Sequence, residues 1–252
     1  MSVFEPSGPP RLARLLWERD VELVGLPAII GRRPRPSAVV RMARPPWWTP
    51  HRSEETVPVG DRGFVVRDTR IAYENPWMRV REDAIVRADG SPGLFGVVEK
   101  SDFALIIPVD TDGVWLVEQF RHPVGGRYWE FPQGSWEDQP DVGPAELAEA
   151  ELREETGLRA GRLDHLGQIF TAYGYADQAC QVWLATELSP GQRELSVEEQ
   201  DLVTRRFSHR EWGDLLAGGV IKDASSLAAW ALLCASPLRE RAFGRAVSFP
   251  GS

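Results

Sequence analysis

The chain has 252 residues, a formal net charge of −8 and an isoelectric point near 5.2. This length suits one large domain, or a smaller domain with an appendage, and either can bury a sizeable hydrophobic core. The acidic balance excludes a general electrostatic affinity for nucleic acid or for an anionic membrane, so a polyanionic ligand would need a local arginine cluster or a metal ion.

Cysteine usage and hydropathy predict a cytoplasmic protein. Cys180 and Cys234 do not form a C-x-x-C pair, which argues against a disulfide framework and a cysteine-rich zinc site. The longest apolar stretch, SLAAWALLCA, is too short to cross a bilayer, and no N-terminal run has the pattern of a secretory signal. We therefore expect a reducing, cytoplasmic setting and no membrane partner.

Residues 1–60 differ in composition from the rest of the chain. They contain half of its 20 prolines, with arginine and acidic residues scattered among them. Such a composition predicts a largely irregular N-terminal extension, in which Arg11–Arg19 is the one candidate helix. We place the folded domain at residues 61–240 and a C-terminal tail at residues 241–252.

From Gly63 onward, runs of β-forming residues alternate with turn signals. A helix at residues 144–156 interrupts them, and two more helices are predicted at residues 210–217 and 225–234. The predicted order is a set of strands, one helix, more strands and two final helices. This order is typical of an α+β fold and not of a doubly wound βαβ repeat. The predicted strands cover residues 63–73, 77–87, 93–100, 103–110, 114–122, 163–170, 179–185 and 202–207.

The helix predicted at residues 144–156 has clear ends and an apolar face. Pro144 suits its first turn, where a missing N–H costs no hydrogen bond, and Gly157 suits the position after its last residue. At about 100° per residue, Leu147, Ala148 and Leu152 lie on one side of the helix and form the apolar face.

The glutamates of this helix divide between its two faces. Glu149 and Arg153 point away from the apolar face, toward solvent. Glu151 and Glu155 fall in the middle of the apolar face, one turn apart, and Glu154 lies at its margin. Two carboxylates withdrawn from water raise each other's pKa or require a cation. Because no lysine is near in sequence, a hard divalent cation is the natural partner, and a merely solvated glutamate run is disfavoured.

Three loops around this helix carry further candidate residues. The stretch WEFPQGSWED precedes the helix and predicts a strand that ends at residues 132–134, where Gly134 permits a turn and a close approach of the backbone to a ligand. The stretch AYGYADQ interrupts a later strand with a tyrosine-bearing glycine loop. The stretch SVEEQD, residues 196–201, adds carboxylates, although it reads equally well as a solubilising loop.

Residues 134–158 resemble the Nudix box, G-x5-E-x7-R-E-U-x-E-E-x-G-U, in which U is an aliphatic residue. The run ELREETGL, residues 151–158, matches its last eight positions. The similarity extends upstream through EQFRHPVGGRYWEFPQG and downstream through AYGYADQ, and covers about residues 63–234. The resemblance implies an α/β/α sandwich with a mixed sheet.

Two positions depart from the box. Ala150 stands where an arginine is expected, and Val142 stands where the isolated glutamate is expected. In the family that arginine mainly orients the glutamates, so its absence bears on ligand alignment and rate more than on metal binding. Glu137 or Asp138, in an expanded loop, is the candidate replacement for the missing acid.

The resemblance implies hydrolysis of a nucleoside diphosphate linked to another group, with Mg²⁺ or Mn²⁺ as cofactor. The implied metal ligands are Glu151, Glu155, an assisting Glu154 and the carbonyl oxygen of Gln133. In several subfamilies the general base lies on a late loop, where this chain has Glu198 and Glu199. Glu154 is a further candidate for a catalytic carboxylate.

Within the family, the leading strands, the Q-F-R segment and W-E-F-P-x-G are most similar to the ADP-ribose and nucleoside-diphosphate-sugar pyrophosphatases. In that group Arg121 would contact the diphosphate, a task that suits a guanidinium fork, and Glu130 would support the site. The leading strands, residues 63–100, are usually exchanged across a homodimer and help to line the nucleoside pocket. The candidate pocket residues are Tyr73, Trp77, Arg81 and Tyr173, although ordinary packing explains the first three equally well.

The downstream loop points to a different substrate. ADP-ribose enzymes characteristically have a proline there, whereas this chain has Ala172–Tyr173–Gly174. A tyrosine is more typical of enzymes that act on dinucleoside polyphosphates, since its ring can stack on a base. Three hypotheses stay open: an ADP-ribose or nucleotide-sugar pyrophosphohydrolase, a dinucleoside polyphosphate hydrolase, and a Nudix nucleotide-binding or sensor domain with weakened catalysis.

Overall fold

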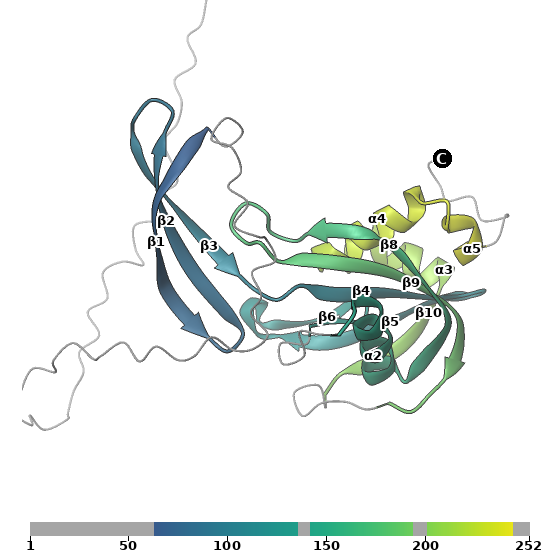
Figure 1. Cartoon of the computed structure of the whole chain (residues 1–252). Helices are drawn as coiled ribbons and strands as arrows, with labels where there is room; N and C mark the ends of the chain where they lie inside the picture. The colour runs from purple at the N-terminus through teal and green to yellow at the C-terminus, as the bar shows by residue number, and fades with distance from the viewer. Residues whose placement is uncertain (1–62, 136–141, 194–200, 244–252) are drawn as a thin grey trace, which may run out of the picture. The chain divides into compact units, whose positions relative to one another are not determined.

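The computed structural model describes residues 63–135, 142–193 and 201–243 (Figure 1). The N-terminal extension with its candidate helix lies outside the described residues, and so does most of the predicted tail. Within the described part, Cys180 and Cys234 are both free thiols, in line with the predicted absence of disulfides. Burial, with smaller effects of Asp223 and Asp102, raises the pKa of Cys180 to about 12.

The first sheet is a small antiparallel one. Its strands are β1 (Phe64–Asn75), β2 (Met78–Arg87) and β3 (Pro92–Glu99). The strand order is β1-β2-β3, and the register of β1 on β2 shifts twice, between Val66 and Asp68 and between Ile71 and Tyr73. These strands agree closely with the predicted runs of β-forming residues.

The second sheet is mixed. Its strands are β4 (Phe103–Asp110), β5 (Gly113–Arg121), β6 (Gly126–Glu130), β7 (Gln133–Gly134), β8 (Leu158–Phe170), β9 (Ala179–Pro190) and β10 (Val203–Ser208). The main order is β10-β5-β4-β9-β8, while β6 pairs with β5 and β7 pairs with β4. Only β4 and β9 pair in parallel within this described sheet. The α+β class and the mixed sheet are therefore confirmed.

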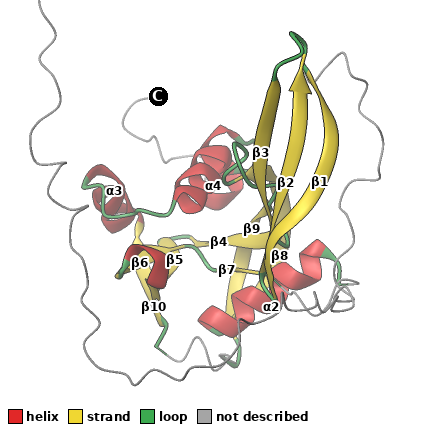
Figure 2. Cartoon of the chain, turned by 90° about the vertical axis from the view of Figure 1, so that its left-hand side faces the viewer, coloured by secondary structure: helices red, strands yellow, loops and turns green. Residues whose placement is uncertain are grey.

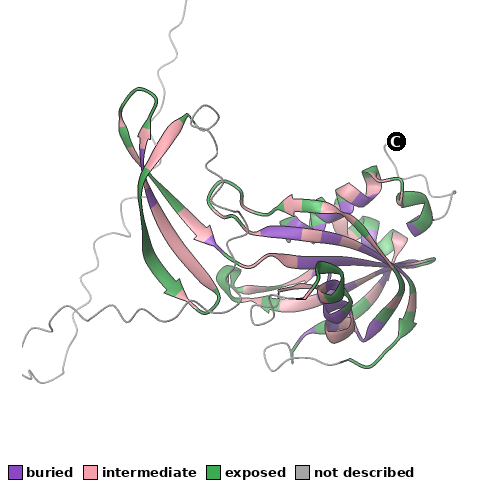
Figure 3. Cartoon of the chain, viewed as in Figure 1, coloured by how far each residue is buried: buried purple, intermediate pink, exposed green. Residues whose placement is uncertain are grey.

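Helices cover both faces of this second sheet. The helices are α2 (Pro144–Thr156), α3 (His209–Ala217), α4 (Ala224–Ala235) and α5 (Arg239–Phe243). Ile106 of β4 packs with Leu152 of α2, whereas the next residue, Ile107, belongs to the cluster that contains Trp212 of α3 and Trp230 of α4. Alternate residues of a strand face opposite sides of its sheet, so β4 is buried on both faces. Figure 2 shows α2 on one side of β4, with α3 and α4 on the other, and Figure 3 shows the resulting burial.

The structure also contains elements that the sequence pattern did not predict. These are the 3₁₀ helix η2 (His122–Val124) and α5, and the single strand predicted to end at Gly134 is divided into β6 and β7. A strand as short as β7 has no periodicity and exists because Gln133 and Gly134 pair with β4. The strand β8 begins directly after α2, earlier than predicted. No helix in the described part of the chain is long and apolar enough to cross a membrane.

Candidate metal and diphosphate site

The last turn of α2 is fixed by hydrogen bonds from three different segments. Gly157 has a φ of 71° and donates from its N–H to the carbonyl oxygen of Arg153 at 2.8 Å. Arg193 and Thr204 donate from their side chains to the carbonyl oxygen of Glu155 at 2.9 and 2.8 Å. The last carbonyls of a helix have no partner within the helix, so these donors satisfy them and hold Glu155 in place.

Glu151 and Glu155 face the interior of the domain. Their exposed fractions are 4% and 1%, which confirms the inward orientation predicted from the helical period. The Glu154 side chain is 28% exposed, and Glu149 is exposed on the opposite face. Carboxylates are rarely buried this deeply unless they are paired, hydrogen-bonded or coordinated.

Both buried carboxylates meet the stretch EFPQG, which we call the Glu130–Gly134 segment. The N–H of Gln133 donates to Oε2 of Glu155 at 3.0 Å. A Cβ atom on Gly134 would lie 2.5 Å from the Cδ atom of Glu151. The Glu151 carboxylate therefore occupies the space that any larger residue at position 134 would need.

These groups fit a hard divalent cation. Among the described residues, no three aspartate, glutamate, histidine or cysteine side chains converge into a complete metal cage. Mg²⁺ does not require one, because it retains several waters and binds through one or two carboxylates together with substrate phosphates. Two buried glutamates against a backbone segment that carries the Gln133 carbonyl provide such a donor set. Their role as ligands stays a prediction.

Arg121 and Glu130 form an ion pair beside this segment. Arg121 donates from Nε to Oε2 of Glu130 at 3.1 Å and from Nη2 to Oε1, which also accepts from Nε2 of Gln119 at 2.8 Å. Burial raises the pKa of Glu130 against the opposing effect of Arg121. Burial lowers the pKa of Arg121, but the charges of Glu130, Glu155 and Asp223 outweigh it and raise that pKa. The guanidinium thus stays charged close to the α2 carboxylates.

The candidate pocket residues have different surroundings. Arg81 forms ion pairs with Glu99 and, at 3.0 Å, with Asp83 inside its own sheet. Trp77 is 54% exposed and Tyr173 is 85% exposed, so both rings are open to a ligand or to another protein surface. Tyr73 is exposed in the same way.

The loop that carries Tyr173 is attached to the end of β3. Val98 donates from its N–H to the carbonyl oxygen of Tyr175 at 2.7 Å, and the N–H of Asp177 donates back to Val98 at 3.2 Å. Val98 and Ala176 form a parallel bridge. The structure therefore brings two exposed tyrosines, Tyr173 and Tyr175, next to the first sheet, which the sequence did not indicate.

Two departures from the box and four candidate acids complete the comparison with the predicted site. Ala150 is buried and Val142 is half-buried, and neither has a polar side chain to offer in place of the expected arginine and glutamate. The candidate general bases and the candidate replacement acids lie outside the described residues. They are Glu198, Glu199, Glu137 and Asp138.

Sequence reasoning missed three polar residues that surround the Glu130–Gly134 segment. Gln119 holds Glu130, as described above, while Asp223 accepts a hydrogen bond from Nε2 of Gln133 at 3.3 Å. Ser226 accepts a hydrogen bond from the N–H of Phe131 at 2.9 Å. The stretch DASS ahead of an apolar run is a helix N-cap signal, and it marks where α4 begins but not what α4 contacts.

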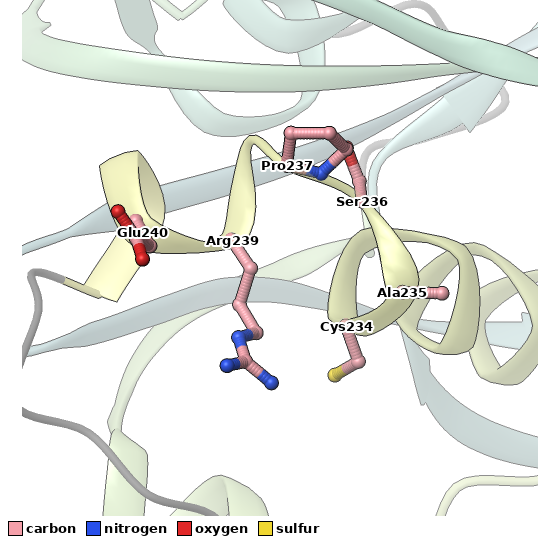
Figure 4. A pocket seen from close by; sticks show the side chains of 6 residues that line it. All are labelled: Cys234, Ala235, Ser236, Pro237, Arg239 and Glu240. Carbon is pink, nitrogen blue, oxygen red and sulfur yellow. The ribbon is translucent and has the colours of Figure 1, made fainter.

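A surface hollow of about 560 Å³ lies where α4 ends and α5 begins (Figure 4). It is lined by Cys234, Ala235, Ser236, Pro237, Arg239 and Glu240. Neither the Glu130–Gly134 segment nor the glutamates of α2 are among the residues that line this hollow.

Two known domain families match adjacent parts of this chain. Residues 65–98 match the nucleoside diphosphate sugar hydrolase N-terminal domain, and residues 100–200 match the NUDIX domain. The boundary between the two matches coincides with the boundary between the first and second sheets.

Among similar proteins, an ADP-ribose pyrophosphatase of Mycobacterium tuberculosis (strain ATCC 25618 / H37Rv) is 32% identical over 151 residues, which covers 59% of this chain and 72% of the relative. An ADP-ribose pyrophosphatase of Bacillus subtilis (strain 168) is 33% identical over 100 residues, and a methanol dehydrogenase activator of Bacillus methanolicus is 30% identical over 100 residues. The chain spans 53% of the length of each of these two relatives.

A solved structure shares the fold. A crystal structure of an ADP compounds hydrolase superposes with a TM-score of 0.63 at 19% sequence identity, covering 71% of this chain and 96% of that one. At this identity the likeness supports the architecture alone, and it confirms the predicted α/β/α sandwich.

Proposed function

This chain belongs to the Nudix family of pyrophosphohydrolases, and from that premise we propose that it hydrolyses the diphosphate linkage of ADP-ribose or a related nucleotide sugar, with Mg²⁺ or Mn²⁺ as cofactor. The products are a nucleoside monophosphate and a phosphorylated sugar. The proposal rests chiefly on the two buried glutamates, Glu151 and Glu155, held against Gln133 and Gly134.

Glu151 and Glu155 would hold the cation together with the carbonyl oxygen of Gln133, and Glu154 would assist from the edge of the site. When bound, the cation neutralises diphosphate charge and lowers the pKa of the attacking water. Because the two glutamates are buried, little bulk water screens their attraction for a cation. Glu198 and Glu199 stay the candidate general bases, since such a base must reach the attacking water.

Arg121 would bind the diphosphate in an orientation that Glu130 sets. Glu130 accepts from Nε and Nη2, whereas no hydrogen bond from Nη1 to a described residue is present. The side chain is 40% exposed and can donate from Nη1 to a phosphate oxygen. Glu130 therefore acts on the substrate through Arg121.

ADP-ribose is the preferred substrate in this proposal because two features support it. The N-terminal strands match the domain of nucleoside diphosphate sugar hydrolases, and two relatives are named ADP-ribose pyrophosphatase. A dinucleoside polyphosphate is the second candidate, favoured by the exposed Tyr173 ring in the loop where ADP-ribose enzymes have a proline.

A substrate panel tests the proposal. Full-length protein with Mg²⁺ is expected to release AMP and ribose 5-phosphate from ADP-ribose with a kcat/KM at least about tenfold above that for diadenosine tetraphosphate, a difference of about 1.4 kcal/mol in transition-state binding. Nucleotide products are quantified by ion-exchange chromatography, and UDP-glucose represents other nucleotide sugars. A preference for diadenosine tetraphosphate would favour the second candidate. Nucleotide binding without turnover of any compound would favour a sensor domain.

We also propose a homodimer formed through the first sheet. Its register places Ile71 and Phe95 on one face and Tyr73 and Leu94 on the other, and their exposed fractions are 44%, 43%, 52% and 61%. A small sheet with apolar residues exposed on both faces is marginal by itself, and a second copy would cover it.

Light scattering tests the dimer. The measured mass of the full chain is expected to be about twice its monomer mass of 28.2 kDa. The Leu94→Arg substitution is expected to lower the measured mass toward that of the monomer. Lys222→Ala, a surface change outside this sheet, is the control. A wild-type protein that stays monomeric at micromolar concentration would contradict the proposal.

A further inference from the structure

Two helices hold the Glu130–Gly134 segment in place. One of them is α2, which binds the segment through its glutamates. The other is α4, whose N-cap residue, Asp223, lies next to the segment. Its Oδ2 atom accepts from Nε2 of Gln133 at 3.3 Å. The residue whose N–H binds Glu155 thus has its side chain bound to Asp223.

Asp223 also holds the segment indirectly, through Ser226. The same Oδ2 atom accepts from the N–H of Ser226 at 2.8 Å and from its hydroxyl at 2.7 Å. The Ser226 oxygen in turn accepts from the N–H of Phe131 at 2.9 Å. Ser226 and Phe131 are both fully buried, so water does not compete for these bonds.

One carboxylate oxygen therefore collects three donors that connect two positions of the segment to the start of α4. Helix capping alone accounts for the bonds to the N–H groups of Ser225 and Ser226. It does not account for the bond to Gln133, which is distant in sequence, nor for the link through Ser226 to Phe131.

We propose that Asp223 is a positioning residue of the active site, which fixes the Glu130–Gly134 segment so that the Gln133 carbonyl meets the cation and Glu130 presents Arg121 to the diphosphate. This inference rests on the proposed function, because the position of the segment matters for catalysis only if a cation and a diphosphate bind there. Asp223 touches neither of them and acts through Gln133 and Ser226.

The test uses Asp223→Asn in the full chain. Asparagine still caps a helix, but its neutral amide oxygen accepts the bonds from Gln133 and Ser226 more weakly than a carboxylate oxygen does. Its amino group also cannot accept the bond that Oδ1 of Asp223 receives from the N–H of Ser225. Mn²⁺ affinity in the absence of substrate is expected to fall about tenfold, as for other outer partners of metal ligands, and kcat for ADP-ribose is expected to fall with it. Calorimetry and electron paramagnetic resonance measure the affinity.

Ser208→Ala is the matched control. Ser208 caps α3 through its hydroxyl, which accepts from the N–H of Glu211 at 3.2 Å, and it has no bond to the Glu130–Gly134 segment in the described structure. Losing that cap is expected to lower the melting temperature by roughly 2–4 °C. It is expected to leave Mn²⁺ affinity and kcat unchanged.

A double-mutant cycle separates positioning from general destabilisation. If Asp223 acts through Gln133, then Asp223→Asn costs much less Mn²⁺ affinity in a Gln133→Leu background than in the wild type. Equal Mn²⁺ affinity and kcat in Asp223→Asn and in Ser208→Ala would overturn this inference while the proposed function stands. A wild-type protein that binds no Mn²⁺ and hydrolyses no diphosphate would overturn both.

Discussion

Glu155→Gln is expected to lower kcat/KM for ADP-ribose by roughly a thousandfold while the protein stays folded. Glutamine has the same shape and can still accept the hydrogen bond from the N–H of Gln133, so the fold loses little. The substitution removes the negative charge at a position that is 1% exposed, so the cation would lose a ligand. A bound cation stabilises the transition state by several kcal/mol, which is why a large loss of activity is expected. Steady-state kinetics with Mg²⁺ measures the loss.

Two further measurements make this result specific. Mn²⁺ is expected to raise the melting temperature of the wild type but not that of Glu155→Gln, because a ligand stabilises only the protein that binds it. Glu149→Gln changes an exposed glutamate on the same helix and is expected to behave like the wild type. Unchanged hydrolysis in Glu155→Gln would show that the metal site lies elsewhere.

Gly134→Ala is expected to cost about a hundredfold in kcat/KM, although it adds a single methyl group. Its Cβ would come within 2.5 Å of Cδ of Glu151, so either the glutamate or the backbone of the segment must move. A displacement of about 1 Å in a catalytic group costs on the order of a hundredfold. Mn²⁺ affinity is expected to fall as well, since Glu151 and the Gln133 carbonyl would no longer share one geometry.

Gly213→Ala is the control for this substitution. Gly213 lies in α3, is exposed, and a Cβ there would meet nothing within 4 Å. Alanine is the better helix former, so this variant is expected to gain about 0.5–1 kcal/mol of stability with unchanged activity. If Gly134→Ala retained wild-type kinetics, the close contact between Gly134 and Glu151 would have no catalytic importance.

Helical periodicity was sufficient to orient the glutamates of α2. Glu151 and Glu155 share a face with Leu152, and all three are buried, whereas Glu149 is exposed. The period of 3.6 residues is a local property, so it can be read without knowledge of any other segment. The predicted strands succeeded for the same reason, since runs such as FALIIPVD are recognisable by themselves.

Short elements and long-range polar contacts could not be predicted in this way. The strand predicted to run to Gly134 stops at Glu130 and resumes as the two-residue β7, because β6 pairs with β5 whereas β7 pairs with β4. Arg121 and Glu130 were each predicted to lie in the site, but their contact with each other was not predicted. The hydrogen bond between them depends on β5 and β6 lying side by side.

By itself, then, the sequence determined the α+β class, the ends of α2 and the inward direction of its glutamates, because these follow from the repeat of a single helix or strand. Only the tertiary structure decided what those glutamates meet. Gln133 lies between Glu155 of α2 and Asp223 of α4, from which it is separated by 22 and 90 positions in the chain. Such contacts arise when packed layers bring distant segments together, and no local pattern records them.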